Sequence, residues 1–186
     1  MSTKYRPPEG FTLWFTGWSG AGKTTLAIEV EKALHERGIP FVQRLDGDIV
    51  RQDLTRDLGF SREDRNENIR RVTFVAELLS KNGVATLVSF ISPYREAREK
   101  ARTRCTNFIE VYMKCSPEVL KERDVKGYYR KAQQQQMKNL TGIDDPYEEP
   151  MHPEIVIDSG TVSVGEARES ILALLEKRNL IPAETS

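Results

Sequence analysis

Residues 17–25, GWSGAGKTT, have the residue types and spacing of a phosphate-binding loop. Gly17, Gly22, Lys23 and Thr24 match the pattern G-x-x-x-x-G-K-[ST], in which glycines let backbone N–H groups surround an anion and the lysine adds a positive charge. We expect Lys23 to bridge the β- and γ-phosphates of ATP and the Thr24 hydroxyl to ligate Mg²⁺. The competing interpretation makes Lys23 a solvated lysine at a helix start. The expected ATP-binding residues are Gly17, Trp18, Ser19, Gly20, Ala21, Gly22, Lys23, Thr24 and Thr25.

Two acids, Asp46 and Asp48, follow the second predicted strand in the stretch LDGD. Many nucleotide hydrolases of this type carry an acid at the end of the strand beside the loop, where this chain has Ser89. On an extended segment, residues i and i+2 face one way, so both carboxylates are expected to point into one cleft. One of them, Asp46 in our assignment, organises the water around Mg²⁺, while the other accepts a proton from an incoming hydroxyl. The alternative is an Asp-Gly turn with a helix N-cap.

Cations, an amide and an aromatic follow these acids. Arg65 and Asn68 are three apart on a predicted helix, so they lie side by side and are candidates to face the cleft, together with Arg51 before them. Phe60 is a core aromatic or a plate that stacks on a purine ring. For Arg70 and Arg71 the sequence leaves open whether either faces the cleft or is solvated and ion-paired.

These residues need a scaffold, and the apolar pattern predicts one of alternating strands and helices. Such alternation indicates an α/β fold, a mainly parallel five-stranded sheet with helices on both faces, with ligands at the carboxyl ends of the strands. The expected strands are 11–16, 41–45, 84–90, 108–113 and 154–158. The expected helices are 23–38, closed by Gly38, then 49–54, 63–81, 94–103, 117–123 and 164–178.

The chain of 186 residues predicts a single domain, residues 1–186, with one insertion. That insertion, about 124–150, is polar and rich in Gly, Pro and Asp, but it also carries tyrosines and spaced cations. We interpret it as a mobile lid that closes over anionic ligands, with a disordered surface loop as the alternative.

Composition narrows the possible partners. Lysine plus arginine and aspartate plus glutamate both number 28, so no net charge recruits nucleic acid or an anionic membrane. No apolar stretch is long enough to span a bilayer and the N-terminus is polar, which predicts a cytoplasmic protein. Cys105 and Cys115 lack metal-ligand spacing and are expected to be ordinary thiols.

Four longer blocks resemble one family of P-loop kinases, the adenylylsulfate kinases. These blocks are LDGDIVRQDLTRDLGFSREDRNENIRR, SFISPYREAR, RDVKGYYRKA and LTGIDDPYEEP, and the resemblance runs from about residue 10 to the C-terminus. It implies that ATP phosphorylates the 3′-hydroxyl of adenosine 5′-phosphosulfate (APS), commonly in a homodimer and with a functional link to ATP sulfurylase. Phosphosulfate recognition requires cationic and amide donors, and an adenine ring requires an aromatic plate.

The resemblance also implies residue roles. The APS contacts carry over onto Asp48, Arg51, Phe60, Arg65, Asn68, Ile91, Ser92, Lys126, Asn139 and Leu140, and Arg123 matches a position against the ATP adenine. The catalytic set is Lys23, Asp46, Asp48 and Ser92. For Ser92, a phosphorylated intermediate has been proposed in the family, whereas we favour a hydrogen-bonding serine, because in-line transfer needs no covalent intermediate.

The chain departs from the family pattern in and near the lid. It has Tyr128 for leucine, Gln133 for arginine, Gln135 for glycine, and Leu140 for a phenylalanine that helps sandwich the APS adenine. We therefore expect weaker acceptor binding or altered lid closure, and Leu140→Phe is expected to lower the Michaelis constant for APS. Two rival functions stay open: another small-molecule P-loop kinase acting on a nucleoside, shikimate or gluconate, and a nucleotide-sensing relative without turnover.

Overall fold

The computed structural model of the chain describes residues 9–123 and 146–183. Its strands are β1 (Phe11–Thr16), β2 (Val42–Asp46), β3 (Ala85–Ser89), β4 (Phe108–Lys114) and β5 (Ile155–Asp158). Its helices are α1 (Lys23–Glu36), α2 (Gly47–Val50), α3 (Arg62–Lys81), α4 (Arg95–Arg104), α5 (Pro117–Arg123) and α7 (Val164–Lys177). Most of the expected lid, 124–145, lies outside the described residues, as do Lys126, Tyr128, Gln133, Gln135, Asn139 and Leu140.

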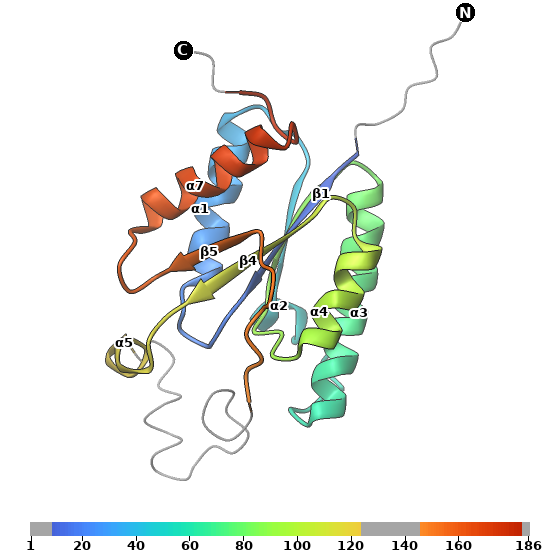
Figure 1. The fold of residues 1–186 in the computed structure, drawn as a ribbon. Coiled ribbons are helices and arrows are strands. Elements are labelled where there is room, and N and C mark those ends of the chain that lie inside the picture. Colours follow the sequence, from blue (N-terminus) through green and yellow to red (C-terminus); the bar gives the residue numbers. More distant parts are fainter. Residues whose placement is uncertain (1–8, 124–145, 184–186) are drawn as a thin grey trace, which may run out of the picture.

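The five strands form one sheet in the order β2-β3-β1-β4-β5, and every pairing is parallel. Helices α1 and α7 cover one face and α3 and α4 cover the other, which gives three layers (Figure 1). This confirms the predicted α/β sandwich. Because all strands run the same way, the loops that follow β1, β2 and β3 meet at one edge of the sheet.

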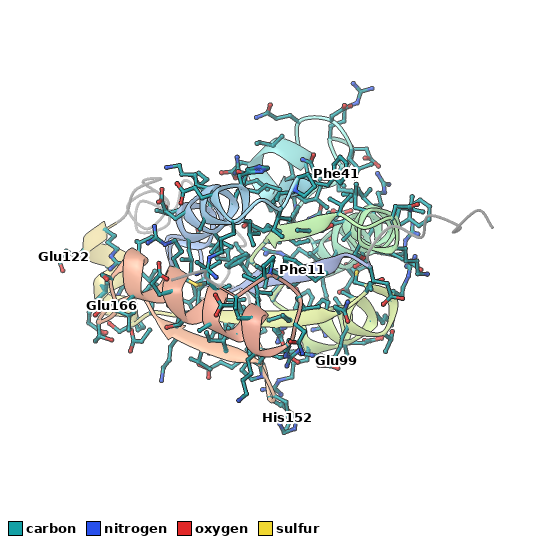
Figure 2. The ribbon with its side chains drawn as sticks, turned by 90° about the horizontal axis from the view of Figure 1, so that it is seen from above. Phe11, Phe41, Glu99, Glu122, His152 and Glu166 are labelled. Carbon is teal, nitrogen blue, oxygen red and sulfur yellow. The ribbon has the colours of Figure 1, made fainter. Side chains whose placement is uncertain are left out.

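The central strand β1 supplies both cores through its alternating side chains. Leu13 and Phe15 pack with α1 and α7, whereas Trp14 packs with α3 and α4 on the opposite face. Seen from above, side chains fill the space on both sides of the sheet, with Phe11 inside and Phe41 at the β2 edge (Figure 2). Burial on both faces explains why apolar residues follow one another along β1 and do not alternate with exposed polar ones.

The short helix after β2 begins earlier than its sequence pattern predicts. We expected 49–54, but α2 spans Gly47–Val50 and gives way to turns up to residue 57. The Asp46 side chain accepts a hydrogen bond from the backbone N–H of Asp48, so Asp46 is the N-cap that starts the helix. The Asp-Gly turn with an N-cap is therefore the correct reading of LDGD: Asp46 is extended, as expected, but Asp48 is already helical.

Other local expectations are confirmed. Gly38, with a φ of 77°, follows the C-cap of α1 and donates to His35 O, as expected for a glycine that ends a helix. Cys105 is buried, Cys115 is half-buried, and both are free thiols. Within 9–123 and 146–183, no helix has the length and apolar character needed to cross a membrane.

Candidate active site

The loop between β1 and α1 has the shape that its glycines allow. Gly17 has a φ of 145°, and a Cβ there would lie 2.4 Å from Met113 O, so no larger residue fits without rearrangement. Gly22 has a left-handed φ of 89° and caps α1 without a side-chain hydrogen bond. A helix start of this kind, following a glycine loop, is suited to binding an anion through backbone N–H groups.

Lys23 lies within this loop and is not a solvated lysine. Its side chain is 9% exposed, and Nζ donates hydrogen bonds to Gly17 O at 2.8 Å and to Trp18 O at 2.7 Å. The ammonium is therefore held against the start of the loop, where it contributes a fixed positive charge to the phosphate site.

Thr24 connects the loop to the end of β2. Its hydroxyl donates to Asp46 Oδ2 at 2.6 Å, while Asp46 Oδ1 accepts from Asp48 N at 3.0 Å. Both Asp46 oxygens therefore have fixed partners, and Asp46 is buried. Asp48, the second residue of α2, is exposed at the rim of the same site.

One crevice of about 410 Å³ joins the loop to the residues expected to bind the acceptor. It is lined by Ser19, Gly20, Gly22, Lys23, Thr24, Thr25, Asp46, Gly47, Asp48, Arg51, Phe60, Arg65, Asn68, Ile69, Ser89, Phe90, Ile91, Ser92 and Pro93. Five of these were not predicted as site residues, and all but Ser89 adjoin a predicted one: Gly47, Ile69, Ser89, Phe90 and Pro93.

Phe60 is held by two arginines at the crevice. The guanidinium carbons of Arg51 and Arg65 lie 4.5 and 5.8 Å from the centre of its ring. Arg65 Nε also donates to Phe60 O at 2.9 Å. The ring is 51% exposed, so the interpretation of Phe60 as a core aromatic is wrong. Burial lowers the pKa of Arg51, and the neighbouring charge of Arg65 lowers it further.

Two buried polar atoms of the crevice have no hydrogen-bond partner among residues 9–123 and 146–183. They are Asn68 Oδ1 and Ser89 Oγ, on side chains that are 4% and 6% exposed. Ser89 lies at the end of β3 in register with both Asp46 and Phe15. It occupies the position where many nucleotide hydrolases carry an acid. Since leaving a buried polar atom unpaired is costly, these atoms are suited to receiving polar groups of a ligand.

Ser92 follows β3 in a strained conformation. Its φ is 46°, in the left-handed region that non-glycine residues rarely adopt, and its side chain is buried. Trp14 Nε1 donates to Ser92 Oγ at 3.1 Å, across 78 residues of sequence. Trp14 of β1 therefore holds the Ser92 hydroxyl in place, and Ser92 itself lines the crevice.

Some predicted residues lie elsewhere. Gly17, Trp18 and Ala21 belong to the loop but do not line the crevice. Arg123, at the end of α5, donates to Ser159 O at 2.6 Å and lies outside the crevice lining. The interpretation of Arg70 and Arg71 as solvated or ion-paired arginines is confirmed.

Ion pairs account for these two arginines. Arg70 Nε lies 2.6 Å from Glu67 Oε2, and Arg71 Nη1 lies 2.7 Å from Asp57 Oδ1. Neither arginine lines the crevice.

A parallel α/β sheet with a glycine loop after its central strand, and with cations facing that loop across one crevice, defines a P-loop kinase of small-molecule acceptors. The family model described as "Adenylylsulphate kinase" matches residues 9–158. The adenylyl-sulfate kinase of Halothermothrix orenii is 54% identical over 176 residues, covering 95% of each chain. The chain belongs to the adenylylsulfate kinase family, and its activity is the ATP-dependent phosphorylation of APS in sulfate assimilation.

Two further proteins are similar to this chain. The solved structure of the Mycobacterium tuberculosis APS kinase, in complex with AMPPNP and APS, is 42% identical with a TM-score of 0.87, covering 91% of this chain and 99% of that one. A probable bifunctional SAT/APS kinase of Sorangium cellulosum is 47% identical over 93% of this chain and only 30% of its own length. The fold and the family predicted from the sequence are therefore confirmed.

Proposed function

We propose that the crevice holds both nucleotides of the reaction, with the ATP triphosphate at the loop and APS on the side of α3. The single observation that carries this placement is that Lys23 and Thr24 share one crevice with Arg51, Phe60, Arg65 and Asn68. A phosphoryl group can pass in line between two molecules only when both are bound in one such space.

On the donor side, the amides of residues 17–25 and the start of α1 would hold the phosphates, and Lys23 would contact the transferred group. We keep Arg123, the last residue of α5, as a residue for the ATP adenine, since its bond to Ser159 O holds it against the loop after β5. The solved APS kinase with AMPPNP bound supports ATP as the phosphoryl donor.

The residues at the loop fit a magnesium ion. Mg²⁺ prefers hard oxygen ligands and retains several waters, and the Thr24 hydroxyl and Asp46 carboxylate are oxygen groups already in contact. Across the described parts of the chain, no cluster of three or more His, Cys, Asp or Glu side chains can hold a metal. Thr24 and Asp46, the latter through water, would therefore share the ion with phosphate oxygens. When bound, Mg²⁺ neutralises phosphate charge during transfer.

On the acceptor side, Arg51 and Arg65 would pair with the phosphosulfate and Phe60 would stack on the adenine. The unpaired Asn68 Oδ1 would accept a hydrogen bond from a ligand donor, and Ile91 and Ser92 would form the wall behind it. Lys126, Asn139 and Leu140 complete this set by resemblance to the family and lie outside the described residues.

For the transfer itself, Asp48 would accept the proton of the APS 3′-hydroxyl as its oxygen bonds to the γ-phosphorus of ATP. The bond between that phosphorus and the β-γ bridging oxygen breaks, and ADP leaves with the electron pair. Asp48 is suited to this role because it lies at the crevice without serving as the helix cap. Ser92 would provide a hydrogen bond and no covalent intermediate.

The wider organisation is also proposed. We propose one domain over residues 1–186 and a homodimer in the cytoplasm. Phe41, Phe74 and Leu78 are exposed apolar side chains that a second copy would cover, and sedimentation velocity tests the homodimer. The bifunctional SAT/APS kinase of Sorangium cellulosum supports a functional link to ATP sulfurylase.

One assay tests the placement and its rivals. The purified chain is incubated with Mg·ATP and APS, or with nucleosides, shikimate or gluconate, while ADP release is followed. We expect ADP release with APS and with none of the other acceptors. An ATP analogue should inhibit the reaction without competing with APS, because the two bind at different subsites. Equal rates with other acceptors would favour another small-molecule kinase, and binding without turnover would favour a nucleotide sensor.

A further inference from the structure

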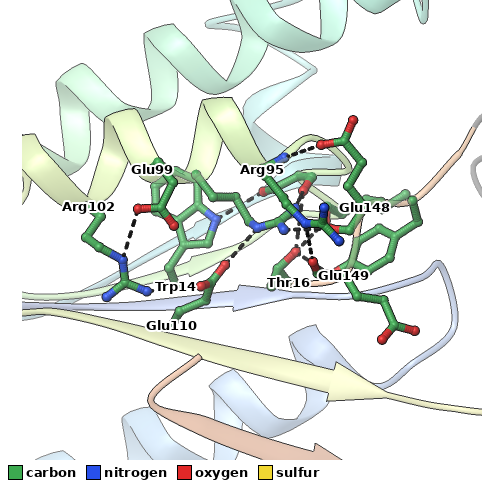
Figure 3. Close-up of polar contacts among 12 residues, drawn as sticks. Trp14, Thr16, Arg95, Glu99, Arg102, Glu110, Glu148 and Glu149 are labelled. Carbon is green, nitrogen blue, oxygen red and sulfur yellow. Dashed lines mark hydrogen bonds and ion pairs between the residues drawn. The ribbon is translucent and has the colours of Figure 1, made fainter. Parts of the chain in front are cut away.

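Beneath the acceptor side of the crevice lies a buried arginine that the mechanism above does not use. Arg98, from α4, is 1% exposed, and its Nε donates to Glu110 Oε1 of β4 at 2.7 Å. Its Nη1 donates to Ser92 O at 2.5 Å and its Nη2 to Glu148 O at 2.6 Å. Figure 3 shows this network with the labelled Glu110 and Glu148 around it. One guanidinium therefore joins a strand, the crevice wall and the segment that follows residue 145.

The bond to Ser92 is made where the backbone needs support. A serine at a φ of 46° is crowded by its Cβ, so that conformation persists only where surrounding contacts hold it. Three side chains lie against this residue: Trp14 donates to its hydroxyl, Arg98 donates to its carbonyl oxygen, and the Thr16 hydroxyl lies 3.5 Å from that oxygen. Arg98 makes the shortest of them, and it is charged.

The bond to Glu148 extends the support to a second segment. Glu148 N donates to Pro93 O at 2.8 Å, and the Glu148 carboxylate accepts from Arg95 N at 2.8 Å. The Thr16 hydroxyl, just before the phosphate-binding loop, lies 2.7 Å from Ile91 O and 2.8 Å from the Tyr147 hydroxyl. Because Thr16 has one proton to give, and it donates that proton to Ile91 O, Tyr147 donates to Thr16.

We propose that Arg98 is a positioning residue for the acceptor: it fixes the peptide of Ser92 against the segment at Glu148, and so sets the wall on which APS rests. This inference rests on the proposed placement of APS at Ile91 and Ser92. Arg98 itself does not line the crevice, so it acts on the acceptor only through Ser92. The phosphate-binding loop keeps its own contacts through Lys23, so ATP binding is expected to be affected less.

The test is Arg98→Lys, with Arg102→Lys as the matched control. A lysine keeps the charge beside Glu110 but lacks the planar fork that reaches Ser92 O and Glu148 O together. Arg102 lies on the same helix and also pairs with Glu110, at 3.0 Å, yet it contacts neither Ser92 nor Glu148 in the described interactions. Both variants weaken an ion pair with the buried Glu110 carboxylate, but only Arg98→Lys also loses the bonds that hold Ser92 against Glu148.

We expect Arg98→Lys to raise the KM for APS by about tenfold, with the KM for ATP within about twofold of wild type. Arg102→Lys is expected to lower thermal stability and leave both KM values unchanged. A purely structural role would reduce the active fraction, and therefore the apparent kcat, without this split. Unchanged KM values, or equal rises for both nucleotides in folded Arg98→Lys, would overturn the proposal.

If Arg98→Lys does not fold, Tyr147→Phe decides, because it removes only the hydroxyl bonded to Thr16 at the same junction. A rise in the KM for APS of about threefold supports the proposal, and an unchanged value overturns it. Failure of the underlying placement is distinguishable: variants at Arg65 and Asn68 that keep Arg98 would then bind APS as tightly as wild type, whatever the outcome at Arg98.

Discussion

The Thr24 hydroxyl donates a hydrogen bond to Asp46 Oδ2 at 2.6 Å, and the second oxygen of Asp46 caps α2 through Asp48 N. One carboxylate therefore ties the phosphate-binding loop to the strand end that presents Asp48. Together with the magnesium role proposed for Asp46, this means that its removal is expected to have two effects, one on the fold and one on metal binding, which two substitutions can separate.

Asp46→Asn is expected to keep the cap, because asparagine caps helices as well as aspartate, but to lose the negative charge beside the proposed magnesium position. The variant should melt close to wild type while needing more Mg²⁺ for half-maximal activity. Asp46→Ala should in addition lose about 0.5–2 kcal/mol of stability with the cap. Thermal melts and Mg²⁺ titrations of the ATP-binding enthalpy measure the two effects. Equal Mg²⁺ requirements for Asp46→Asn and wild type would remove Asp46 from the metal site.

Lys23→Ala is expected to abolish phosphoryl transfer while leaving the fold intact, since Lys23 Nζ donates to Gly17 O and Trp18 O, which belong to the loop and to none of the strands. Loss of one such charged donor typically costs about 10²–10³ in kcat. Lys32→Ala is the matched control: the residue lies on the same helix, its side chain is 61% exposed, and it pairs with Glu29. Circular dichroism and ADP release compare the two variants, and a rate for Lys23→Ala near that of the control contradicts the assignment.

Asp48→Asn should spare ATP binding and suppress turnover, by about 10²–10⁴-fold if Asp48 is the general base. Calorimetric ATP binding and single-turnover rates at saturating APS separate binding from chemistry. Asp53→Asn, an exposed aspartate a few residues further on, is the control for the loss of one charge. A near-normal rate for Asp48→Asn would remove Asp48 from catalysis.

Phe60→Ala is expected to weaken APS binding and leave ATP binding unchanged, because the ring faces the crevice between Arg51 and Arg65. Stacking of this kind is worth about 0.5–1.5 kcal/mol, which is about a 2- to 12-fold change in affinity. Phe74→Ala removes an aromatic of similar exposure, 49%, from α3 but outside the crevice. Equal APS affinity of the two variants would show that Phe60 does not stack on the acceptor.

Cys105 should make stability fall at alkaline pH. Burial raises the pKa of its thiol to about 11, and Glu77 adds to this while Arg104 and Lys81 oppose it. The raised pKa favours the protonated thiol in the folded state. Its contribution is therefore fully present below the unfolded pKa, near 9, and is lost as pH rises through 11.

Denaturant unfolding of wild type and Cys105→Ala between pH 8 and 11 measures this slope, with Cys115→Ala as the control. The two curves should converge by about 2 kcal/mol across the window. Parallel curves for wild type and Cys105→Ala would show that the thiol does not titrate with a raised pKa.

Local signals predicted most of the fold. Apolar runs ending in glycine placed β1 and its loop, and Arg65 and Asn68 share the crevice because residues three apart on a helix share a face. The start of α2 was missed because it depends on the orientation of one side chain, that of Asp46, and not on apolar periodicity.

The support beneath the crevice had no sequence signal. Arg98 is 12 residues from Glu110 and 50 from Glu148, so only the sheet topology brings these three together. In sequence, Arg98 looks like one more charge on a polar helix, and its burial cannot be read from its neighbours. Ser92 was predicted from the family resemblance, but its left-handed backbone follows from tertiary contacts alone.

A crystal structure with ADP, Mg²⁺ and APS bound together tests the central claim most directly. We expect the ADP phosphates on the loop around Lys23. APS is expected against Phe60, Arg65 and Asn68, with its 3′-hydroxyl within hydrogen-bond distance of Asp48. APS bound elsewhere, or bound here with its 3′-hydroxyl turned away from Lys23 and Asp48, would contradict it.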